Sequence, residues 1–480
     1  MYMTEKYFIK RVLVFAGFII LASCVTRKYQ QPGVAVQGML YRDTTSTVSG
    51  DSSFVDSTSM ATLSYTRLFT DTLLQHLIDE GIRENLDLKT AVERMNEAQA
   101  SFRQSKAALL PSLDANATAT RNKQSIAALN LPPDFIGTFP LVTMNYQLSL
   151  SSSWEADIWG KLRSAKKAAL ANLLQSEAAI RAVQTQLVAN IARYYYQLLS
   201  LDQQLKITEQ TLINRTNDFN TMQQLKENAV VNGAAVMQSD ANRYAAEVLI
   251  PDLKRNIRET ENALSVLLAK TPGSIKRSTL ESQEPYRDLH TGVSSLLLRN
   301  RPDIQQAEFG FRAAFENTNV ARTYFYPQLT LTGQGGLSTL QIKNLFDMSV
   351  FYNIVAGLAQ PVFSKGQNKA RLRIAQARQK QAYFAYQQTL LNAGEEVSNA
   401  LYAYQTSTQK QQSRKHQVAA LEKAVNYTKQ LLEYSSATNY TDVLTSEQAL
   451  LTARLNGVND KLEQLMAIVE LYRSLGGGWQ

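Results

Sequence analysis

The sequence is poor in residues that cross-link or interrupt a chain. Among 480 residues there is one cysteine, Cys24, and there are three widely separated histidines. A lone cysteine excludes intramolecular disulfides and cysteine-based metal sites, so we expect no metal and no cofactor. We also find no arrangement of nucleophile, base and acid, no phosphate-binding loop and no carboxylate pair, so we do not expect an enzyme. With only 21 glycines and 11 prolines, the composition favours a largely helical protein.

Long apolar runs and blocks of one charge are also missing. After the N-terminal segment, nothing approaches the roughly 20 apolar residues that a membrane-spanning helix needs. The net charge is +9, but the basic residues are scattered among acidic ones. Nucleic-acid-binding proteins show a basic stripe with stacking aromatic residues. We therefore expect no nucleic-acid partner.

The first 24 residues have the pattern of a lipoprotein signal peptide. Three basic residues precede an apolar run at 12–21, which ends in Leu21-Ala22-Ser23-Cys24. Small residues before a cysteine resemble the bacterial lipobox, so we predict a signal peptide at 1–23 and lipid attachment, including palmitate, at Cys24. An unlipidated secretory signal with an incidental cysteine is the alternative. The residue after the cysteine is Val25, whereas an aspartate there would suggest retention in the inner membrane, so we expect the outer membrane. The polar stretch 24–64 predicts an extended tether.

The rest of the chain reads as a duplicated unit. Pro111-Ser-Leu-Asp has a counterpart in Pro327-Gln-Leu-Thr, and each starts an alternating segment after a helical stretch. We predict a first repeat at 65–275 and a second at 276–480. Each repeat is expected to contain a helix, two strands joined by a loop, a very long helix, a turn and a further helix.

Four segments of about ten residues alternate between apolar and polar side chains, which predicts strands. They span 112–121, 142–153, 328–337 and 350–361. Their length and alternation suit strands that cross a bilayer with one face toward lipid. A soluble hairpin with one buried face would look the same. Because the smallest membrane barrels have about eight strands, either the sheet is soluble or several chains contribute strands to one barrel.

A very long helix is predicted at 158–227, which contains no proline and one glycine. It would be about 105 Å long. Apolar or aromatic residues recur every seven positions at Leu173, Ile180, Leu187, Tyr194 and Leu201, and the second repeat shows the same spacing. A strict seven-residue repeat of apolar positions predicts that the helix forms a left-handed supercoil with partner helices. A simple two-stranded coiled coil is the alternative, but it would not need strand pairs at one end.

Several motifs resemble the TolC-like outer-membrane efflux proteins, specifically the NodT-type lipoprotein branch. They are Trp154-Glu-Ala-Asp-Ile-Trp-Gly-Lys-Leu-Arg163, the stretch 297–308 with Arg301-Pro-Asp, Tyr326-Pro-Gln-Leu, and Leu475-Gly-Gly-Gly-Trp479. Asn300, where the family usually has arginine, and 64–66, where a tryptophan is common, depart from the pattern. The resemblance implies a homotrimer in which each chain gives four strands to one twelve-stranded transmembrane β-barrel. The long coiled-coil helices would form a periplasmic α-helical tunnel that meets a periplasmic adaptor and a proton-driven inner-membrane transporter.

By the same resemblance, the second helix-helix turn carries a periplasmic gate. The family's tyrosine, polar residue and aspartate are best matched by Tyr434, Asn439 and Asp442. Asn439 stands where relatives often have a charged residue, so we expect a hydrogen-bonded gate rather than a salt-bridged one. The alternative is that these residues only cap the helices.

The expected function is a passive gated channel that carries small molecules, such as drugs or toxic compounds, out of the cell as part of a tripartite efflux system. The alternatives are an exit duct for type I protein secretion or metal export, and a periplasmic coiled-coil lipoprotein without a channel. The sequence does not separate the cargoes, because selectivity lies largely in the pump.

Overall fold

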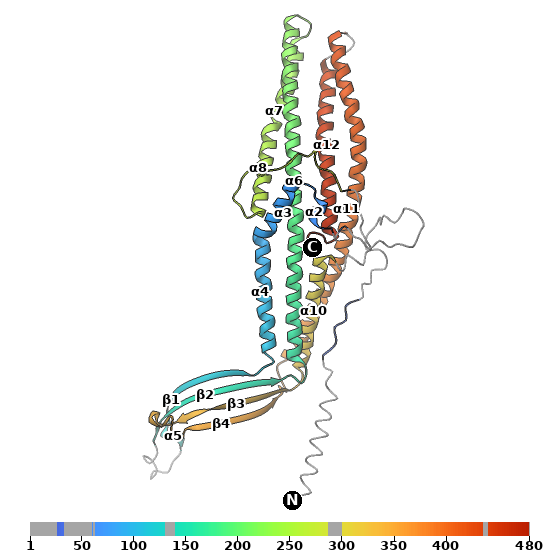
Figure 1. Ribbon diagram of the computed structural model, residues 1–480. Coiled ribbons are helices and arrows are strands. Elements are labelled where there is room, and N and C mark those ends of the chain that lie inside the picture. The colour runs from blue at the N-terminus through green and yellow to red at the C-terminus, as the bar shows by residue number, and fades with distance from the viewer. Residues whose placement is uncertain are drawn as a thin grey trace, which may run out of the picture. The chain divides into compact units, whose positions relative to one another are not determined.

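The computed structural model describes residues 26–32, 60, 63–129, 140–286, 300–434 and 440–479. Helices dominate, and the described elements twice show a helix, two strands, a long helix and a returning helix (Figure 1). The elements are α2 (Tyr65–Leu68), α3 (Thr72–Glu84), α4 (Leu86–Ala107), β1 (Ser112–Lys123), α5 (Ile126–Leu129), β2 (Val142–Ala156), α6 (Lys161–Glu227), α7 (Gly233–Glu247), α8 (Leu249–Leu267), α10 (Pro302–Thr323), β3 (Gln328–Thr339), η3 (Ile342–Asn344), β4 (Val350–Ala359), α11 (Gln367–Tyr434) and α12 (Tyr440–Ser474). Within these ranges, no helix has both the length and the apolar character needed to cross a membrane.

The chain forms two compact units, each drawing on both sequence repeats. Unit 1 contains the sheet and comprises the described residues of 1–33, 95–175 and 308–385. Unit 2 comprises those of 34–94, 176–307 and 386–480. The two compact units differ from the two predicted sequence repeats, 65–275 and 276–480, whose boundaries stay a prediction.

The four strands of unit 1 form one antiparallel sheet in the order β1-β2-β3-β4. All four predicted strands are confirmed, with ends that differ by up to three residues. The strands β2 and β3 join the two repeats, with Leu148 opposite Leu337. In the middle of β2, burial is the reverse of that in a soluble sheet: Leu148 and Leu150 are exposed, whereas Ser149 is buried and accepts a hydrogen bond from Gln334. Both faces of β1 are exposed. Within one chain, the apolar face of the sheet therefore stays uncovered.

Both long helices begin at a glycine in the left-handed backbone region. Gly160, with φ of 76°, precedes α6, and Gly366, with φ of 80°, precedes α11. Glycine adopts this conformation without a steric penalty, so it permits the sharp redirection from strand to helix at both positions. The two helices have 67 and 68 residues.

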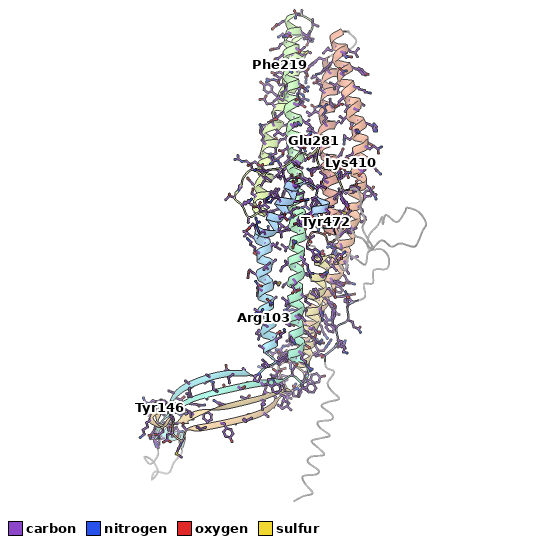
Figure 2. All side chains as sticks on the ribbon, in the orientation of Figure 1. Arg103, Tyr146, Phe219, Glu281, Lys410 and Tyr472 are labelled. Carbon is purple, nitrogen blue, oxygen red and sulfur yellow. The ribbon has the colours of Figure 1, made fainter. Side chains whose placement is uncertain are left out.

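The main hydrophobic core lies in unit 2 and contains the seven-residue series. Leu187 of α6 and Val397 of α11 are buried in it, and so are Ile191 and Leu198, which are themselves seven residues apart. Leu201 is also buried, outside this cluster. The heptad prediction is confirmed for the middle of α6, where the buried core residues lie between Leu187 and Leu199. Figure 2 shows the side chains on the ribbon.

The returning helices of the two repeats differ. In the second repeat α12 runs through 35 residues, whereas the first repeat is divided into α7 and α8 at Val248. Pro251 lies in the first turn of α8. Proline removes a hydrogen-bond donor and clashes with the carbonyl four residues earlier, so it favours a break here.

The C-terminal Gly-Gly-Gly-Trp segment closes unit 2. A Cβ atom on Gly477 would lie 2.2 Å from the Tyr472 ring, and one on Gly476 would lie 2.6 Å from the Asn300 carbonyl oxygen. The Trp479 indole N–H donates to that same carbonyl at 3.2 Å. The segment therefore acts as a packing cap, and the contact uses the backbone of Asn300, which an arginine would supply equally.

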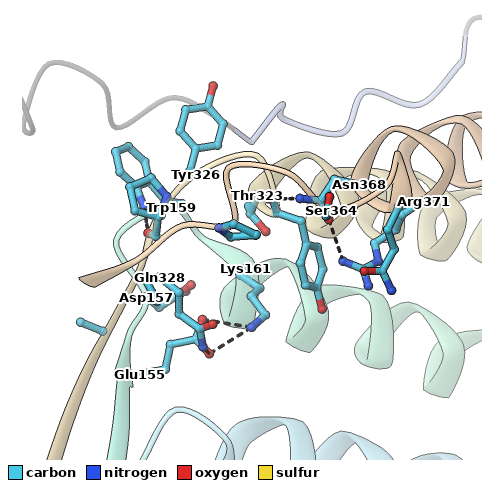
Figure 3. Close-up of a pocket in the computed structure, with 16 residues that line it drawn as sticks. Glu155, Asp157, Trp159, Lys161, Thr323, Tyr326, Gln328, Ser364, Asn368 and Arg371 are labelled. Carbon is cyan, nitrogen blue, oxygen red and sulfur yellow. Dashed lines mark hydrogen bonds and ion pairs between the residues drawn. The ribbon is translucent and has the colours of Figure 1, made fainter. Parts of the chain in front are cut away.

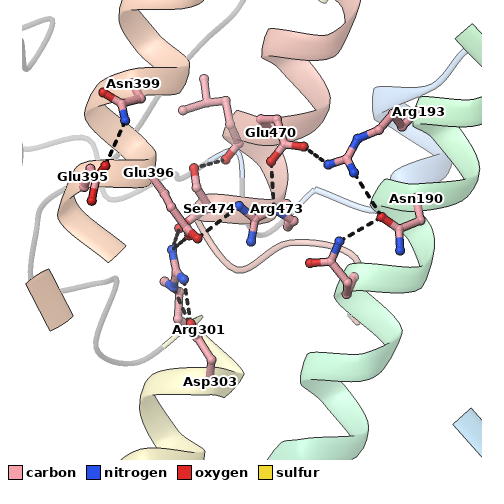
Figure 4. A network of polar contacts seen from close by, with 12 residues as sticks. Asn190, Arg193, Arg301, Asp303, Glu395, Glu396, Asn399, Glu470, Arg473 and Ser474 are labelled. Carbon is pink, nitrogen blue, oxygen red and sulfur yellow. Dashed lines mark hydrogen bonds and ion pairs between the residues drawn. The ribbon is translucent and has the colours of Figure 1, made fainter. Parts of the chain in front are cut away.

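Alternating charges join the helices around this cap (Figure 4). Arg301 pairs with Glu396 at 2.8 Å, and Glu396 pairs with Arg473 at 3.2 Å. Arg473 and Arg193 both pair with Glu470. Burial acts to raise the pKa of Glu470, but hydrogen bonds from the two arginines hold it below its usual range. This network connects α6, α11, α12 and the residue before α10.

Candidate functional site

The gate is predicted in the second helix-helix turn of unit 2, and we call this turn and the first one, between α6 and α7, the tip. Residues 228–232 form the first turn, where Ala229 has a φ of 58°. The Asn232 side chain then caps α7 by accepting from the Ala235 amide at 3.0 Å. In the second turn, residues 435–439 lie outside the described residues.

Of the predicted site residues, the structure fully describes one. Asp442 lies exposed in the first turn of α12, where a carboxylate complements the helix dipole. Tyr434 is the last residue of α11, but its side chain lies outside the described residues, as do Asn439 and Cys24. The contacts predicted among the three gate residues, and the lipid site, therefore stay predictions.

A small apolar cluster connects the two hairpins beside the tip. Met222 of α6, Val236 of α7, and Tyr440, Val443 and Leu444 of α12 are buried together, and Phe219 packs against them (Figure 2). The Tyr440 hydroxyl donates to a buried serine hydroxyl of α7 at 2.7 Å. Burial raises the pKa of Tyr440, so this hydroxyl stays protonated and able to donate near neutral pH.

Next to this cluster, one lysine joins three helices. The Lys429 ammonium group of α11 lies 3.0 Å from Asp218 of α6 and 2.6 Å from Glu447 of α12. Burial raises the pKa of Glu447, and the nearby Asp218 charge raises it further against the opposing effect of Lys429. Although burial acts to lower the pKa of Lys429, its two carboxylate partners hold it above the usual value. The lysine is therefore charged and neutralises a pair of carboxylates that would otherwise repel each other.

A buried arginine makes a parallel connection. Arg215 of α6 donates to the Asn242 carbonyl of α7 and to the Gln448 side chain of α12, each at 2.8 Å. Burial lowers the pKa of Arg215, because its guanidinium group has lost much of its water. These two connections, which we call the tip network, tie α11, α12 and α7 to α6.

The sequence reasoning missed the residues of the tip network. A signal for one of them existed. Leu212 continues the seven-residue spacing of Ile191 and Leu198, and Arg215 follows it by three positions on the same helix face. A charged residue on an apolar face usually has a buried partner.

A second candidate site is a pocket of about 300 Å³ in unit 1, where strands meet long helices (Figure 3). Lys161 pairs with Glu155 at 3.0 Å, and Asp157 accepts from two backbone amides at the start of α6. The Trp159 ring packs against Tyr326, and its N–H donates to a backbone carbonyl at 2.8 Å. Because these polar groups are paired with one another, the pocket fixes the redirection of the chain rather than presenting free groups to a ligand.

Comparison with known proteins identifies the family. The model of the outer membrane efflux protein family matches residues 77–270 and 293–477. The chain belongs to this family.

Two relatives and one solved structure illustrate the similarity. The probable outer membrane lipoprotein SilC of Salmonella typhimurium is 28% identical over 474 residues, which cover 98% of this chain and 99% of SilC. The cation efflux system protein CusC of Escherichia coli O157:H7 is 27% identical over 473 residues, with the same coverage of both chains. The open-state outer membrane channel MtrE of Neisseria gonorrhoeae is 26% identical, covers 95% of this chain and 98% of its own, and gives a TM-score of 0.81.

These findings confirm the resemblance drawn from the motifs, the mainly helical fold with a small sheet, and the outer-membrane location. They place the chain among efflux channel proteins. Among the described residues, no group of three or more metal-ligating side chains occurs.

Proposed function

We propose that this outer-membrane efflux protein is the exit channel of a tripartite pump, a passive gated duct that carries small molecules to the exterior. The observation that carries the proposal is the sheet of unit 1. Its apolar side chains are exposed, Ser149 on the opposite face is buried, and its outer strands β1 and β4 have no further strand partner among the described residues. A membrane strand needs lipid on one face and backbone partners on both edges.

Further copies of the chain would supply those partners. Pairing of β4 with β1 of the next copy closes a barrel of twelve strands from three chains, which supports a homotrimer. The helices of unit 2 then extend into the periplasm toward an adaptor and a proton-driven inner-membrane transporter. Lipid attachment at Cys24 is supported by the name of SilC, a lipoprotein that aligns over nearly the whole chain.

The gate is proposed at the tip, with Tyr434, Asn439 and Asp442 in the second turn and the tip network supporting them. The support is that Tyr440 and Val443 of the same turn of α12 as Asp442 are buried against the other hairpin. A change at Asp442 is therefore coupled to the packing of both hairpins.

Metal export is a second candidate for the cargo. CusC, a relative named for cation efflux, aligns with 98% of this chain. Conductance can be measured with and without an added metal cation. A change caused by the cation would favour a cation-specific duct, and an unchanged conductance would favour a general one.

Conductance of the purified full chain in planar bilayers tests the channel and the gate together. We expect low closed-state conductance, and a higher value in Asp442→Ala because a tip contact is lost. Asp252→Ala is the matched control, since Asp252 also lies in the first turn of a unit 2 helix but belongs to α8. Equal closed-state conductance of Asp442→Ala and the unmodified chain would reject the gating role. No conductance in any variant would instead favour a structural lipoprotein.

A further inference from the structure

The segment after Cys24 is held against α10 in unit 1. The backbone N–H of Arg27 donates to Asn319 Oδ1 at 3.1 Å, and Asn319 Nδ2 donates back to the Arg27 carbonyl at 2.9 Å. Asn319 is fully buried. Two residues further on, the Tyr29 ring packs against Phe311 and Phe315 at 5.9 and 5.6 Å between centroids. These contacts fix the position of Arg27 on the helix.

The same asparagine holds a second arginine. Arg322 Nη1 donates to Asn319 Oδ1 at 2.8 Å, so one oxygen atom accepts from the Arg27 backbone and from the Arg322 side chain. Neither guanidinium group forms an ion pair with a carboxylate in the part of the chain that the structure describes. Burial and the Arg27 charge both lower the pKa of Arg322. Arg27 and Arg322 thus meet at one asparagine. Its Nδ2 also donates to the buried Glu316 carboxylate at 3.1 Å, and among the described residues that carboxylate forms no ion pair with either arginine.

We propose that Arg27 and Arg322 bind the phosphate group of a phospholipid in the membrane that carries this protein. Guanidinium groups match phosphate oxygens with paired, charge-assisted hydrogen bonds, and one phosphate between two arginines removes their repulsion. Lys28, the next residue after Arg27, is exposed and adds a positive charge to this segment.

The distance from the lipid anchor favours a lipid phosphate over a free one. Arg27 is three residues from Cys24, and three residues span at most about 10 Å. With acyl chains on Cys24, the arginine pair therefore lies at the level of the headgroups of the same leaflet. This step rests on the lipid anchor under the proposed function. Acyl chains together with basic residues give firmer anchoring than acyl chains alone.

Native mass spectrometry of the full chain in detergent, with phosphatidylglycerol added, tests the site. We expect the unmodified chain to retain the lipid, and the double variant Arg27→Gln/Arg322→Gln to bind it at least about tenfold more weakly, as loss of charge-assisted hydrogen bonds predicts. Arg103→Gln is the matched control, because Arg103 is an exposed arginine of α4 in the same unit. Equal affinity of the double variant and the unmodified chain would overturn the proposal.

Two further measurements complete the test. Inorganic phosphate at millimolar concentration should leave the bound lipid in place, and full displacement would overturn the lipid assignment in favour of a free anion. Phosphatidylglycerol should raise the Tm of the unmodified chain and of Arg103→Gln but not that of the double variant; an equal rise in all three would contradict the site. The same mass spectra report acylation of Cys24, and conductance is measured separately. A failure of the arginine site is therefore distinguishable from a failure of the anchor or the channel.

Discussion

Removing the Lys429 charge has a defined expected cost. Lys429→Met deletes the contacts to Asp218 and Glu447 but keeps a side chain of similar length. Breaking a buried ion pair by removing one partner costs about 3–5 kcal/mol. The Lys429 side chain is 39% exposed, so solvent screens part of this energy. We expect the free energy of unfolding to fall by about 1–2 kcal/mol near neutral pH.

The penalty in Lys429→Met should depend on pH in one direction. Burial already raises the pKa of Glu447 from 4.5, and Asp218 adds to this. Loss of the lysine raises this pKa further, because two carboxylates then face each other. The folded variant consequently binds a proton at higher pH than the unfolded variant. The penalty is present above the raised pKa and is relieved as the pH falls through it toward 4.5.

Denaturation followed by circular dichroism at neutral and acidic pH measures this effect, and bilayer recording measures its functional consequence. Lys410→Met is the control, since it makes the same charge change on α11 in a pair whose side chains are 51% and 54% exposed (Figure 2). We expect a much smaller change in the free energy of unfolding for the control, because solvent screens this exposed pair. Lys429→Met should also raise closed-state conductance, because α11 loses its connection to α6. Equal behaviour of the two variants, or a penalty that grows on acidification, would refute the reasoning.

Two other substitutions test contacts in unit 2. Asp71→Asn should destabilise the chain at neutral pH: although burial raises the pKa of Asp71, hydrogen bonds to its carboxylate lower it below 3.8 overall. The carboxylate stabilises the folded chain at a pH above the pKa of Asp71 in the unfolded chain, and this stabilisation is lost as the pH falls through the lower pKa of the folded chain. The difference in the free energy of unfolding between Asp71→Asn and the unmodified chain should therefore be larger at pH 7 than at pH 3. Gly477→Ala should cost about 1–3 kcal/mol, since the added Cβ would overlap the Tyr472 ring. An unchanged Tm would contradict this overlap.

The elements of this fold could be predicted because their signals are local. Alternation over ten residues indicated each strand, and spacing by seven indicated the buried face of α6. Helix α10 begins at Pro302 with Asp303 in its first turn, a local pattern that is typical of a helix start. The break between α7 and α8 was missed even though Pro251 was visible, because apolar repeats on both sides suggested one helix.

The contacts of the candidate site could not be predicted in this way. Lys429 and Asp218 are 211 positions apart, and no local pattern distinguishes them from other charged residues on long helices. Asn319 is equally inconspicuous in sequence, since an asparagine within a helix usually faces solvent. Its role depends on a segment 292 positions away. Such pairs form when distant segments pack together, and the periodicity of apolar residues does not specify which segments meet.

If the gate lies at the tip, as proposed, the distribution of apolar contacts in unit 2 favours opening there. The main core buries large side chains fully, such as Ile191, Leu198 and Tyr195, each worth roughly 1.5–3 kcal/mol. The tip is held by a much smaller cluster and by the charges around Lys429, which lose strength in contact with water. Separation of α11 and α12 from α6 therefore costs least at the tip and rises steeply where the main core begins. An adaptor that competes for the charged groups of the tip network could open the end of the duct without unfolding its middle.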